Sequence, residues 1–267
     1  MEQALEIVCP AWYPGAESLI DAIPLLADQG VTAVEIGVNF SSYFNFRDAR
    51  ELQALISVLS SSGVRIHSVH SPFGPGYDIS SPDDNVHDRG VDALIDSIEL
   101  ANVTDATKVI VHASDILPGC RHRQFDRARG VLREMAAVAR ESGVTLALEN
   151  LPPTYLGNCP EEIFALLDGI DRESIAVCFD SGHANLSGHF EEYAQALLPY
   201  AVTTHIHDNN GTDDQHRFPG EGIINWPRFA SIYRSTGCDA GMMLECTPPQ
   251  GIAWCEAFQM FRTALGE

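Results

Sequence analysis

The sequence predicts an α/β fold and, within that class, a (β/α)8 TIM barrel formed by a single domain over residues 1–267. Three observations carry this prediction. Short apolar runs alternate with amphipathic helical stretches eight times, which is typical of a parallel sheet. No linker rich in Pro, Gly or Ser divides the chain, and 267 residues suit one barrel. The expected strands are apolar, as is typical where both faces of a strand are buried.

The strands are expected where apolar or β-branched residues form short runs that stop at a turn or at a polar residue. The run at residues 31–36, for example, stops at Gly37, and the run that begins at Val202 stops in a polar segment. The expected strands cover residues 5–9, 31–36, 64–70, 108–112, 144–149, 175–179, 202–206 and 241–245.

The helices are expected where apolar residues recur every three or four positions, because that spacing places them on one face of a helix. Leu52, Leu55 and Leu59 follow this spacing, and Gly63 stands just past the end, where a glycine commonly terminates a helix. The expected helices cover residues 17–28, 48–62, 87–102, 124–142, 160–168, 190–199, 227–235 and 252–264.

A doubly wound open sheet is the alternative fold for a chain of alternating strands and helices. Such a sheet usually carries a glycine-rich turn after its first strand to hold a phosphate. The sequence has no G-x-G-x-x-G motif at that point. The closed barrel is therefore the preferred interpretation.

The amino-acid composition limits the kinds of molecule that the protein is expected to bind. The chain has 16 Lys and Arg against 37 Asp and Glu, a net charge of −21, so a phosphate backbone would be repelled and nucleic acid is not an expected partner. It has no apolar run long enough to span a membrane and no basic segment followed by an apolar one at its start. Its seven cysteines are scattered without a C-x-x-C motif, which favours reduced thiols and a cytoplasmic location.

Polar residues stand at the C-terminal ends of the expected strands, and in a barrel these ends meet at one mouth. The third to eighth strands each end this way, and the second contributes Glu35. The residues concerned are His70, His112, Glu149, Asp180 with His183 three positions later, His205 with His207, and Glu245.

Each of these residues alone has a structural explanation, such as a hydrogen-bonded histidine or a carboxylate that caps a helix. Six consecutive strands ending this way are hard to attribute to chance. Carboxylates that converge on one mouth also repel each other unless a cation neutralises them. The sequence therefore predicts a divalent metal site, provided that the barrel prediction holds.

The segment from 202 to 222 adds further candidate ligands. It contains His205, His207, Asp214 and His216 and closes on a Pro-Gly-Glu-Gly turn at 219–222. Imidazole and carboxylate crowded in this way suit zinc or manganese. A polar surface loop is the structural alternative, because Asn and Gly in the same segment are typical of turns.

With these residues in place, the chain resembles the xylose isomerase-like TIM-barrel superfamily over nearly its whole length. That superfamily includes sugar phosphate isomerases and epimerases and the endonuclease IV-type enzymes. The resemblance to the epimerases implies one divalent ion, Mn²⁺ or Zn²⁺ among others, held by Glu149, Asp180, His205 and Glu245. His205 is preferred to His207 as the ligand from the seventh strand, because the H-x-x-D motif of the epimerases aligns with His205 and Asp208. His207 stays open as the alternative ligand.

The endonuclease IV-type pattern implies up to three zinc ions and a larger ligand set. Its additional ligands correspond to His70, His112, His183, Asp214 and His216, and all nine positions of the combined pattern are filled. The chain departs from the ketohexose 3-epimerases, which have a glutamate where this chain has Tyr155 and an arginine where it has Gly211.

The main functional hypothesis is a metal-dependent isomerase or epimerase that acts on a small sugar, polyol or sugar phosphate, alone or as a homodimer. Proton transfer next to a carbonyl needs a base and an acid, and Glu149 and Glu245 are the candidates. His183, His207 and Arg217 are candidates to bind the substrate, Arg217 through a phosphate or carboxylate.

Two alternatives remain open from the sequence. One is a multinuclear zinc phosphoesterase acting on a small phosphate ester, with DNA disfavoured by the net charge. The other is a non-catalytic sugar-binding barrel that keeps a relic of the site. The number of ions bound and turnover of sugars distinguish the three.

Overall fold

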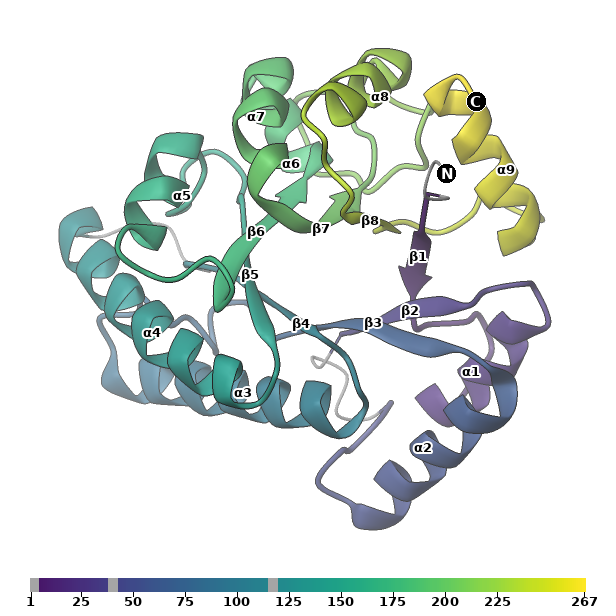
Figure 1. Cartoon of the computed structure of the whole chain (residues 1–267), viewed down its shortest axis with the longest axis horizontal. Helices are drawn as coiled ribbons and strands as arrows, with labels where there is room; N and C mark the ends of the chain where they lie inside the picture. Colours follow the sequence, from purple (N-terminus) through teal and green to yellow (C-terminus); the bar gives the residue numbers. More distant parts are fainter. Residues whose placement is uncertain (1–4, 38–42, 115–119) are drawn as a thin grey trace.

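The computed structural model describes residues 5–37, 43–114 and 120–267. Eight parallel strands form a closed barrel in sequence order, with helices around its outside (Figure 1). β1 (Ile7–Pro10) closes the ring by pairing with β8 (Gly241–Leu244), which confirms the (β/α)8 TIM barrel and excludes an open sheet. The strands between them are β2 (Ala33–Gly37), β3 (Arg65–His70), β4 (Lys108–Val111), β5 (Thr145–Glu149), β6 (Ile175–Asp180) and β7 (Ala201–Ile206).

The helices lie close to their expected positions and begin and end at local sequence signals. The Asp48 side chain accepts hydrogen bonds from the first turn of α2, and Gly63 ends that helix in the left-handed conformation with φ of 72°. The long helices are α1 (Leu19–Ala27), α2 (Ala49–Ser62), α3 (Asp84–Val103), α4 (Arg121–Glu141), α5 (Pro160–Leu167), α7 (Phe190–Leu197), α8 (Trp226–Ser235) and α9 (Trp254–Leu265).

A short helix, α6 (Ser181–Leu186), was not expected from the sequence. Its six residues are too few to display a helical repeat of apolar positions. The side chain of Asp180 caps it by accepting a hydrogen bond of 2.6 Å from the backbone N–H of His183. This cap fixes the first turn after β6 and thereby the position of His183 at the barrel mouth.

The barrel interior is filled by small clusters of buried side chains, whereas a larger apolar cluster lies between the strands and the helices. Val8, Ala33 and Met243 form one interior cluster, and Ile110 and its neighbours from β5 and β6 form another. Because these side chains fill the interior, a ligand can approach only from an end of the barrel.

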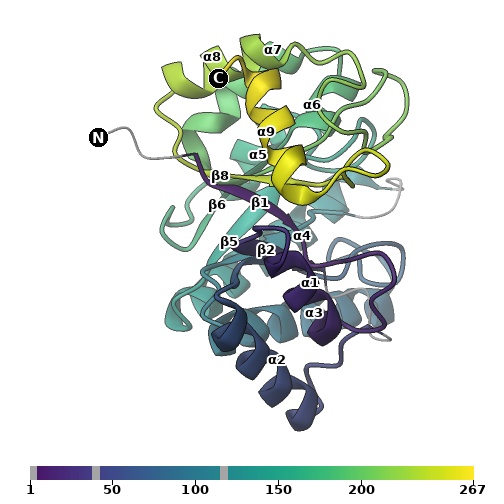
Figure 2. The ribbon, with the colours of Figure 1, turned by 90° about the vertical axis from the view of Figure 1, so that its right-hand side faces the viewer.

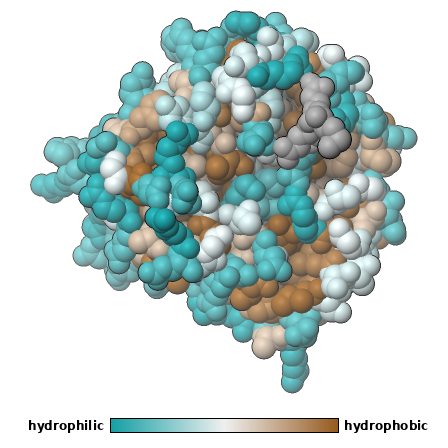
Figure 3. Space-filling model, in the orientation of Figure 1, coloured by the Kyte–Doolittle hydropathy of each residue, from teal (hydrophilic) through white to brown (hydrophobic). Residues whose placement is uncertain are grey.

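The two ends of the barrel differ in character. In Figure 2 the N-terminus lies on the left and β1 runs toward the right, where the loops that follow the strands gather. The face at the N-terminal ends of the strands has a hydrophilic rim with separate hydrophobic patches (Figure 3). None of the helices within the described ranges has the combination of length and apolarity needed to cross a bilayer.

The loop from 209 to 225 is organised by one buried carboxylate, that of Asp208. Its Oδ1 accepts hydrogen bonds from the backbone of Asn209 and Ile224, and its Oδ2 accepts from the backbone of Gly220 and from the indole of Trp226, all at 2.9–3.1 Å. A side chain at position 222 would collide with this carboxylate, so glycine is required there. The Pro-Gly-Glu-Gly turn is thus explained by packing against Asp208.

We expect Asp208→Asn to destabilise the protein by about 2–4 kcal/mol, because one buried oxygen that accepts two N–H groups becomes an N–H donor itself. Urea denaturation followed by circular dichroism measures the change. Asp213→Asn is the matched control on the same loop, since this carboxylate is exposed and should cost less than about 0.5 kcal/mol. Equal stability of the two variants would contradict this account of the loop.

Candidate metal centre

The predicted ligands that follow the strands lie together at the C-terminal mouth of the barrel. Glu149 and Asp180 are the last residues of β5 and β6, and His205 lies in β7. His183 comes from α6, and the loop after β7 supplies Asp214 and His216. The structure brings these residues into one connected set with the four others that follow strands, which are His70, His112, His207 and Glu245.

Glu149 lies at the middle of this set and is almost fully buried. Its Oε2 lies 3.4 Å from His70 Nε2, 3.3 Å from His112 Nε2 and 3.4 Å from His205 Nδ1. Its Oε1 lies 3.3 Å from His183 Nδ1. One carboxylate therefore faces four imidazoles from four different segments.

Four overlapping groups of side chains in the described residues have ligand atoms close enough to share an ion. Within each group, one ligand atom per residue lies within 4.8 Å of every other. The largest group is the quartet that the resemblance to epimerases implied. The groups are Glu149, Asp180, His205 and Glu245; His70, Glu149 and His205; Asp180, His183 and His207; and His207, Asp214 and His216.

His205 and His207 lie on the same side of the chain because side chains two residues apart point the same way in a strand. His205 Nδ1 lies 3.3 Å from Glu245 Oε2, whereas His207 Nε2 lies 3.2 Å from Asp180 Oδ2. The two histidines thus belong to different groups. The ring of His207 packs so closely on the backbone of Gly182 that any side chain there would collide with it.

Backbone carbonyls fix the tautomer of three of these histidines. His70 Nδ1 lies 2.8 Å from the carbonyl of Ser71, and the Nδ1 atoms of His183 and His216 lie 2.9 Å from the carbonyls of Asn150 and Glu245. A carbonyl only accepts, so Nδ1 carries the proton in each neutral ring. The Nε2 lone pair is then left to face the carboxylates, as in a metal ligand.

Glu35 has the same effect on His205 from the opposite side. Its carboxylate lies 3.2 Å from His205 Nε2 and accepts a hydrogen bond of 2.6 Å from Ser68 Oγ. The proton of His205 is thereby held on Nε2, and the Nδ1 lone pair is directed toward Glu149 and Glu245. The sequence marked Glu35 only as a polar strand end; its role as an orienting partner required the structure.

The quartet has the features of a site for a divalent cation. Glu149 Oε2, Glu245 Oε2 and His205 Nδ1 are buried atoms without a hydrogen-bond partner among the described residues, and both oxygens lie 3.3–3.4 Å from that nitrogen. Ligands at about 2.0–2.1 Å from a zinc ion occupy tetrahedral corners about 3.3–3.4 Å apart. The donor types and their spacing therefore fit an ion.

The charges of the centre depend on one another. Burial alone would raise the pKa of the Glu149 carboxyl, but His205 and His112 lower it well below its usual value. Burial alone would lower the pKa of the His205 imidazole, but the surrounding acidic groups raise it well above its usual value. Without a cation, protons on the histidines thus balance the buried carboxylates.

The mouth opens into three cavities that share lining residues. The site cavity, of about 330 Å³, is lined by His112, Glu149, Tyr155 and His216 among others. The connecting cavity, of about 190 Å³, lies between Glu35, His70 and Glu245 on one side and Pro10 and Trp12 on the other. A third cavity, of about 400 Å³, is lined by Pro10, Trp12 and Trp254 and is named the Trp254 cavity here.

Arg217 is the one candidate site residue that the structure does not bring to the ligand groups. It is exposed, and its guanidinium donates a hydrogen bond of 3.1 Å to the carbonyl of Glu221. Its backbone pairs with that of Asp208 at the base of the loop. Among the described contacts, its role is therefore to hold the loop.

Comparison with known proteins identifies relatives over most of the chain. The model of a family described as xylose isomerase-like TIM barrel matches residues 23–264. An uncharacterised protein of Methanocaldococcus jannaschii is 28% identical, with 86% of this chain and 79% of that protein covered. The solved structure of a D-tagatose 3-epimerase-like protein superposes with a TM-score of 0.85 at 25% identity, covering 98% of this chain and 97% of the other.

Two further relatives carry the names of an endonuclease and of a sugar isomerase. A probable endonuclease 4 of a Sulfurihydrogenibium species is 22% identical over 66% of this chain and 69% of its own length. An inosose isomerase of Bacillus velezensis is 27% identical over 45% of this chain and 46% of its own length.

We expect Glu35→Ala to weaken metal binding about 10–100-fold, because His205 loses the partner that holds its proton on Nε2. Competition with a chromophoric chelator measures the affinity. Glu99→Ala, which removes an exposed carboxylate from α3, is the control and should leave the affinity unchanged. An unchanged affinity in Glu35→Ala would remove Glu35 from the centre.

Metal uptake at the His207, Asp214 and His216 group should release protons. Burial alone would lower the pKa of His216, but Asp214 and Glu245 raise it to about 9. At pH 7 the imidazole is protonated, so an ion must displace about one proton, and affinity should fall as pH decreases below about 9. A Zn²⁺ titration with a pH indicator in weak buffer counts the protons; equal release by His216→Gln would contradict the assignment.

Proposed function

The chain belongs to the xylose isomerase-like TIM barrel family, and we propose that it is a divalent-metal-dependent isomerase or epimerase of a small sugar or polyol-derived ketone. The observation that carries this proposal is the quartet Glu149, Asp180, His205 and Glu245 at the barrel mouth. The likeness to the D-tagatose 3-epimerase-like protein and to the inosose isomerase supports the same class of reaction.

The reaction would move a proton at the carbon next to a carbonyl. A bound divalent cation would polarise the carbonyl and hydroxyl oxygens and stabilise the enediolate. Glu149 ends β5 and Glu245 directly follows β8, and a carboxylate oxygen of each lies 3.3–3.4 Å from His205 Nδ1. One carboxylate would take the proton from the substrate carbon and would become protonated in that step. It would then return this proton itself, or the other carboxylate would deliver a proton that it has first taken up from water. The pKa of both carboxyls is lowered, so each starts ionised at neutral pH and can act as the base.

The charge around the mouth favours a neutral sugar over a sugar phosphate. No lysine or arginine lines the three cavities among the residues that the structure describes. A phosphate in this acidic chain would depend on bound cations or on protonated histidines for its counter-charge. A ketohexose 3-epimerase is the less favoured member of the class, because Tyr155 and Gly211 stand where those enzymes carry glutamate and arginine.

A second candidate function is a multinuclear zinc phosphoesterase. Two groups of side chains favour it, because they offer further candidate ion sites beside the quartet. One group is Asp180, His183 and His207, and the other is His207, Asp214 and His216. The likeness to the probable endonuclease 4 points the same way. A net charge of −21 favours a small phosphate ester over DNA as its substrate.

The test is deuterium exchange from D₂O into candidate ketoses and inososes by the Mn²⁺-loaded protein, followed by NMR. We expect Glu149→Gln and Glu245→Gln to lower exchange by about 10²–10⁴-fold, the usual contribution of a general acid or base. Glu256→Gln, at an exposed position of α9, is the control and should retain full activity. No exchange into any sugar would exclude the isomerase.

The same assay distinguishes the two functions when combined with metal analysis. We expect the double variant His70→Ala, His112→Ala to retain exchange if the quartet suffices, since neither residue belongs to it. Three zinc ions per chain, phosphate ester hydrolysis and its loss in the double variant would instead establish the phosphoesterase.

A further inference from the structure

The Trp254 cavity lies beside the candidate centre but has a different chemical character. Among the described residues that line it, none carries a charge; they are aromatic, proline, aliphatic, glycine, thiol, hydroxyl or amide residues. This is unusual on a chain with a net charge of −21. Its volume of about 400 Å³ falls within the range of small-molecule pockets, about 300–1,000 Å³.

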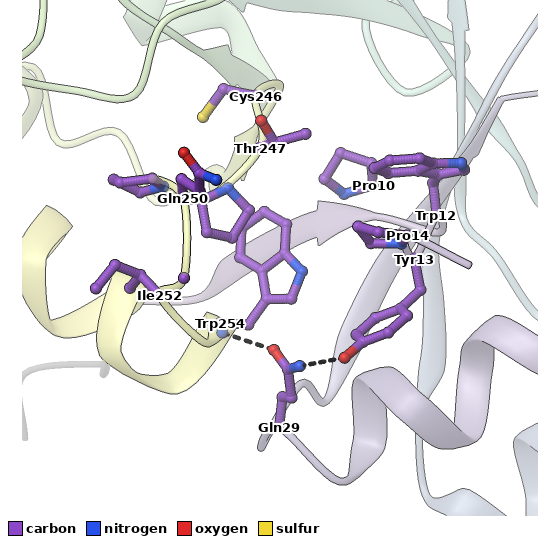
Figure 4. A pocket seen from close by; sticks show the side chains of 13 residues that line it. Pro10, Trp12, Tyr13, Pro14, Gln29, Cys246, Thr247, Gln250, Ile252 and Trp254 are labelled. Atoms are coloured by element: carbon purple, nitrogen blue, oxygen red, sulfur yellow. Dashed lines mark hydrogen bonds between the residues drawn. The ribbon is translucent and has the colours of Figure 1, made fainter. Parts of the chain in front are cut away.

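Hydrogen bonds between the lining residues hold the walls of this cavity in place without a bound ligand. Gln29 Nε2 donates to the hydroxyl of Tyr13 at 2.8 Å, and Gln29 Oε1 accepts from the backbone N–H of Trp254 at 2.8 Å (Figure 4). One amide thus joins the segment after β1, the end of α1 and the start of α9. A cavity that is formed in advance loses less free energy on ordering when a ligand enters.

The Trp254 cavity adjoins the connecting cavity, which in turn reaches the candidate centre. Pro10 and Trp12 line both the Trp254 cavity and the connecting cavity, and the connecting cavity reaches Glu245, His70 and Glu35. Cys246, which lines the Trp254 cavity, directly follows Glu245. A molecule whose reacting carbon lies at the quartet would reach the Trp254 cavity past Pro10 and Trp12, the two residues that line both neighbouring cavities.

The lining selects the kind of group that would occupy this extension. Trp12 is 44% exposed and lies beside Pro10 and Pro14, so its ring offers a free apolar face (Figure 4). Thr247 and Gln250 add uncharged hydrogen-bonding groups on the opposite wall. Aromatic faces with a few neutral polar groups suit an uncharged ring that has an apolar face. Such a ring can carry hydroxyl groups at its edge, as a sugar does, or carry none, as a phenyl ring does. A phosphate or a carboxylate finds no cation here among the described lining residues.

We propose that the Trp254 cavity is a subsite for a second, non-reacting neutral ring, so that the substrates are glycosides rather than free monosaccharides. This rests on the proposed sugar isomerase or epimerase function. The ring is either the pyranose of a disaccharide or the aromatic aglycone of an aryl glycoside, because both present an apolar face to Trp12 and carry no charge. In each case the reacting sugar must keep a carbonyl: the open-chain carbonyl of a reducing sugar unit in the disaccharide, or a ketone on the sugar ring of the aryl glycoside.

Binding to the full-length, Mn²⁺-loaded protein tests this subsite without requiring turnover. Isothermal titration compares phenyl β-D-glucopyranoside and cellobiose with methyl β-D-glucopyranoside, which lacks a second ring. We expect at least one of the two-ring probes to bind about tenfold or more tightly than the methyl glycoside, the effect of burying one apolar face. The phenyl glycoside binding better identifies an aryl aglycone, and cellobiose binding better identifies a pyranose.

Variants at position 250 provide a matched pair. Gln250→Trp should fill the cavity and abolish the preference for two rings, whereas Gln250→Ala leaves the space open and should keep it within about threefold. Trp12→Ala should weaken the two-ring probes by removing the stacking face. Thermal unfolding and circular dichroism verify that each variant is folded. Equal binding of all three probes, or a preference that survives Gln250→Trp, would overturn the subsite.

Deuterium exchange separates this proposal from the function on which it rests. D-Fructose is compared with disaccharides that carry a pyranose on O4 or O6 of fructose, and we expect a kcat/KM about tenfold or more higher for the disaccharides. Turnover of monosaccharides with no two-ring preference in binding removes the subsite and keeps the isomerase. A two-ring preference that Gln250→Trp abolishes, without exchange in any sugar, keeps the subsite and removes the isomerase.

Discussion

Buried negative charge is the constraint on which the rest of this structure depends. Glu149 and Asp180 are almost fully buried at the ends of neighbouring strands, and Glu245 joins them from the end of β8. Water is too scarce there to stabilise these carboxylates, so positive charge must come from protonated imidazoles or from a cation. The histidines around Glu149 can supply either, since they carry a proton in the absence of an ion and offer a lone pair in its presence. This exchange would link the stability of the barrel mouth to the proposed binding of a cation.

The supporting contacts direct the histidines rather than merely pack against them. Carbonyl oxygens hold the Nδ1 protons of His70, His183 and His216, and Glu35 holds the Nε2 proton of His205. His216 also adopts an uncommon left-handed backbone conformation with φ of 44°, in the loop that Asp208 organises. A non-glycine residue in this conformation costs about 1–2 kcal/mol. The loop contacts therefore stabilise a strained residue in a position from which it faces Asp214.

The fold and the gathering of the ligands could be predicted from the sequence, because each depends on local patterns. Apolar periodicity located the strands, and strand ends in a closed barrel share one mouth. The choice between His205 and His207 was harder to make from the sequence. His205 lies in β7 and His207 directly follows it, so that both point to the same side, and only the three-dimensional neighbours assign them to different groups. The roles of Glu35 and Gln29 depend on contacts between residues far apart in the chain, which no local pattern encodes. The role of Asp208 depends on how the loop that follows it folds back onto its carboxylate. The helix α6 was missed because it is too short to show a repeat.

The ligand groups share members, and this sharing bears on how such barrels diversify. Glu149, Asp180, His205 and His207 each belong to two groups, while Asp214 and His216 belong to one and stand on a surface loop. Substitution of Asp214 or His216 would therefore remove the outermost group while the strands and the quartet stay intact. Because surface loops vary more readily than buried strands, a change in the number of ions that the mouth could hold would require few substitutions and would leave the barrel folded.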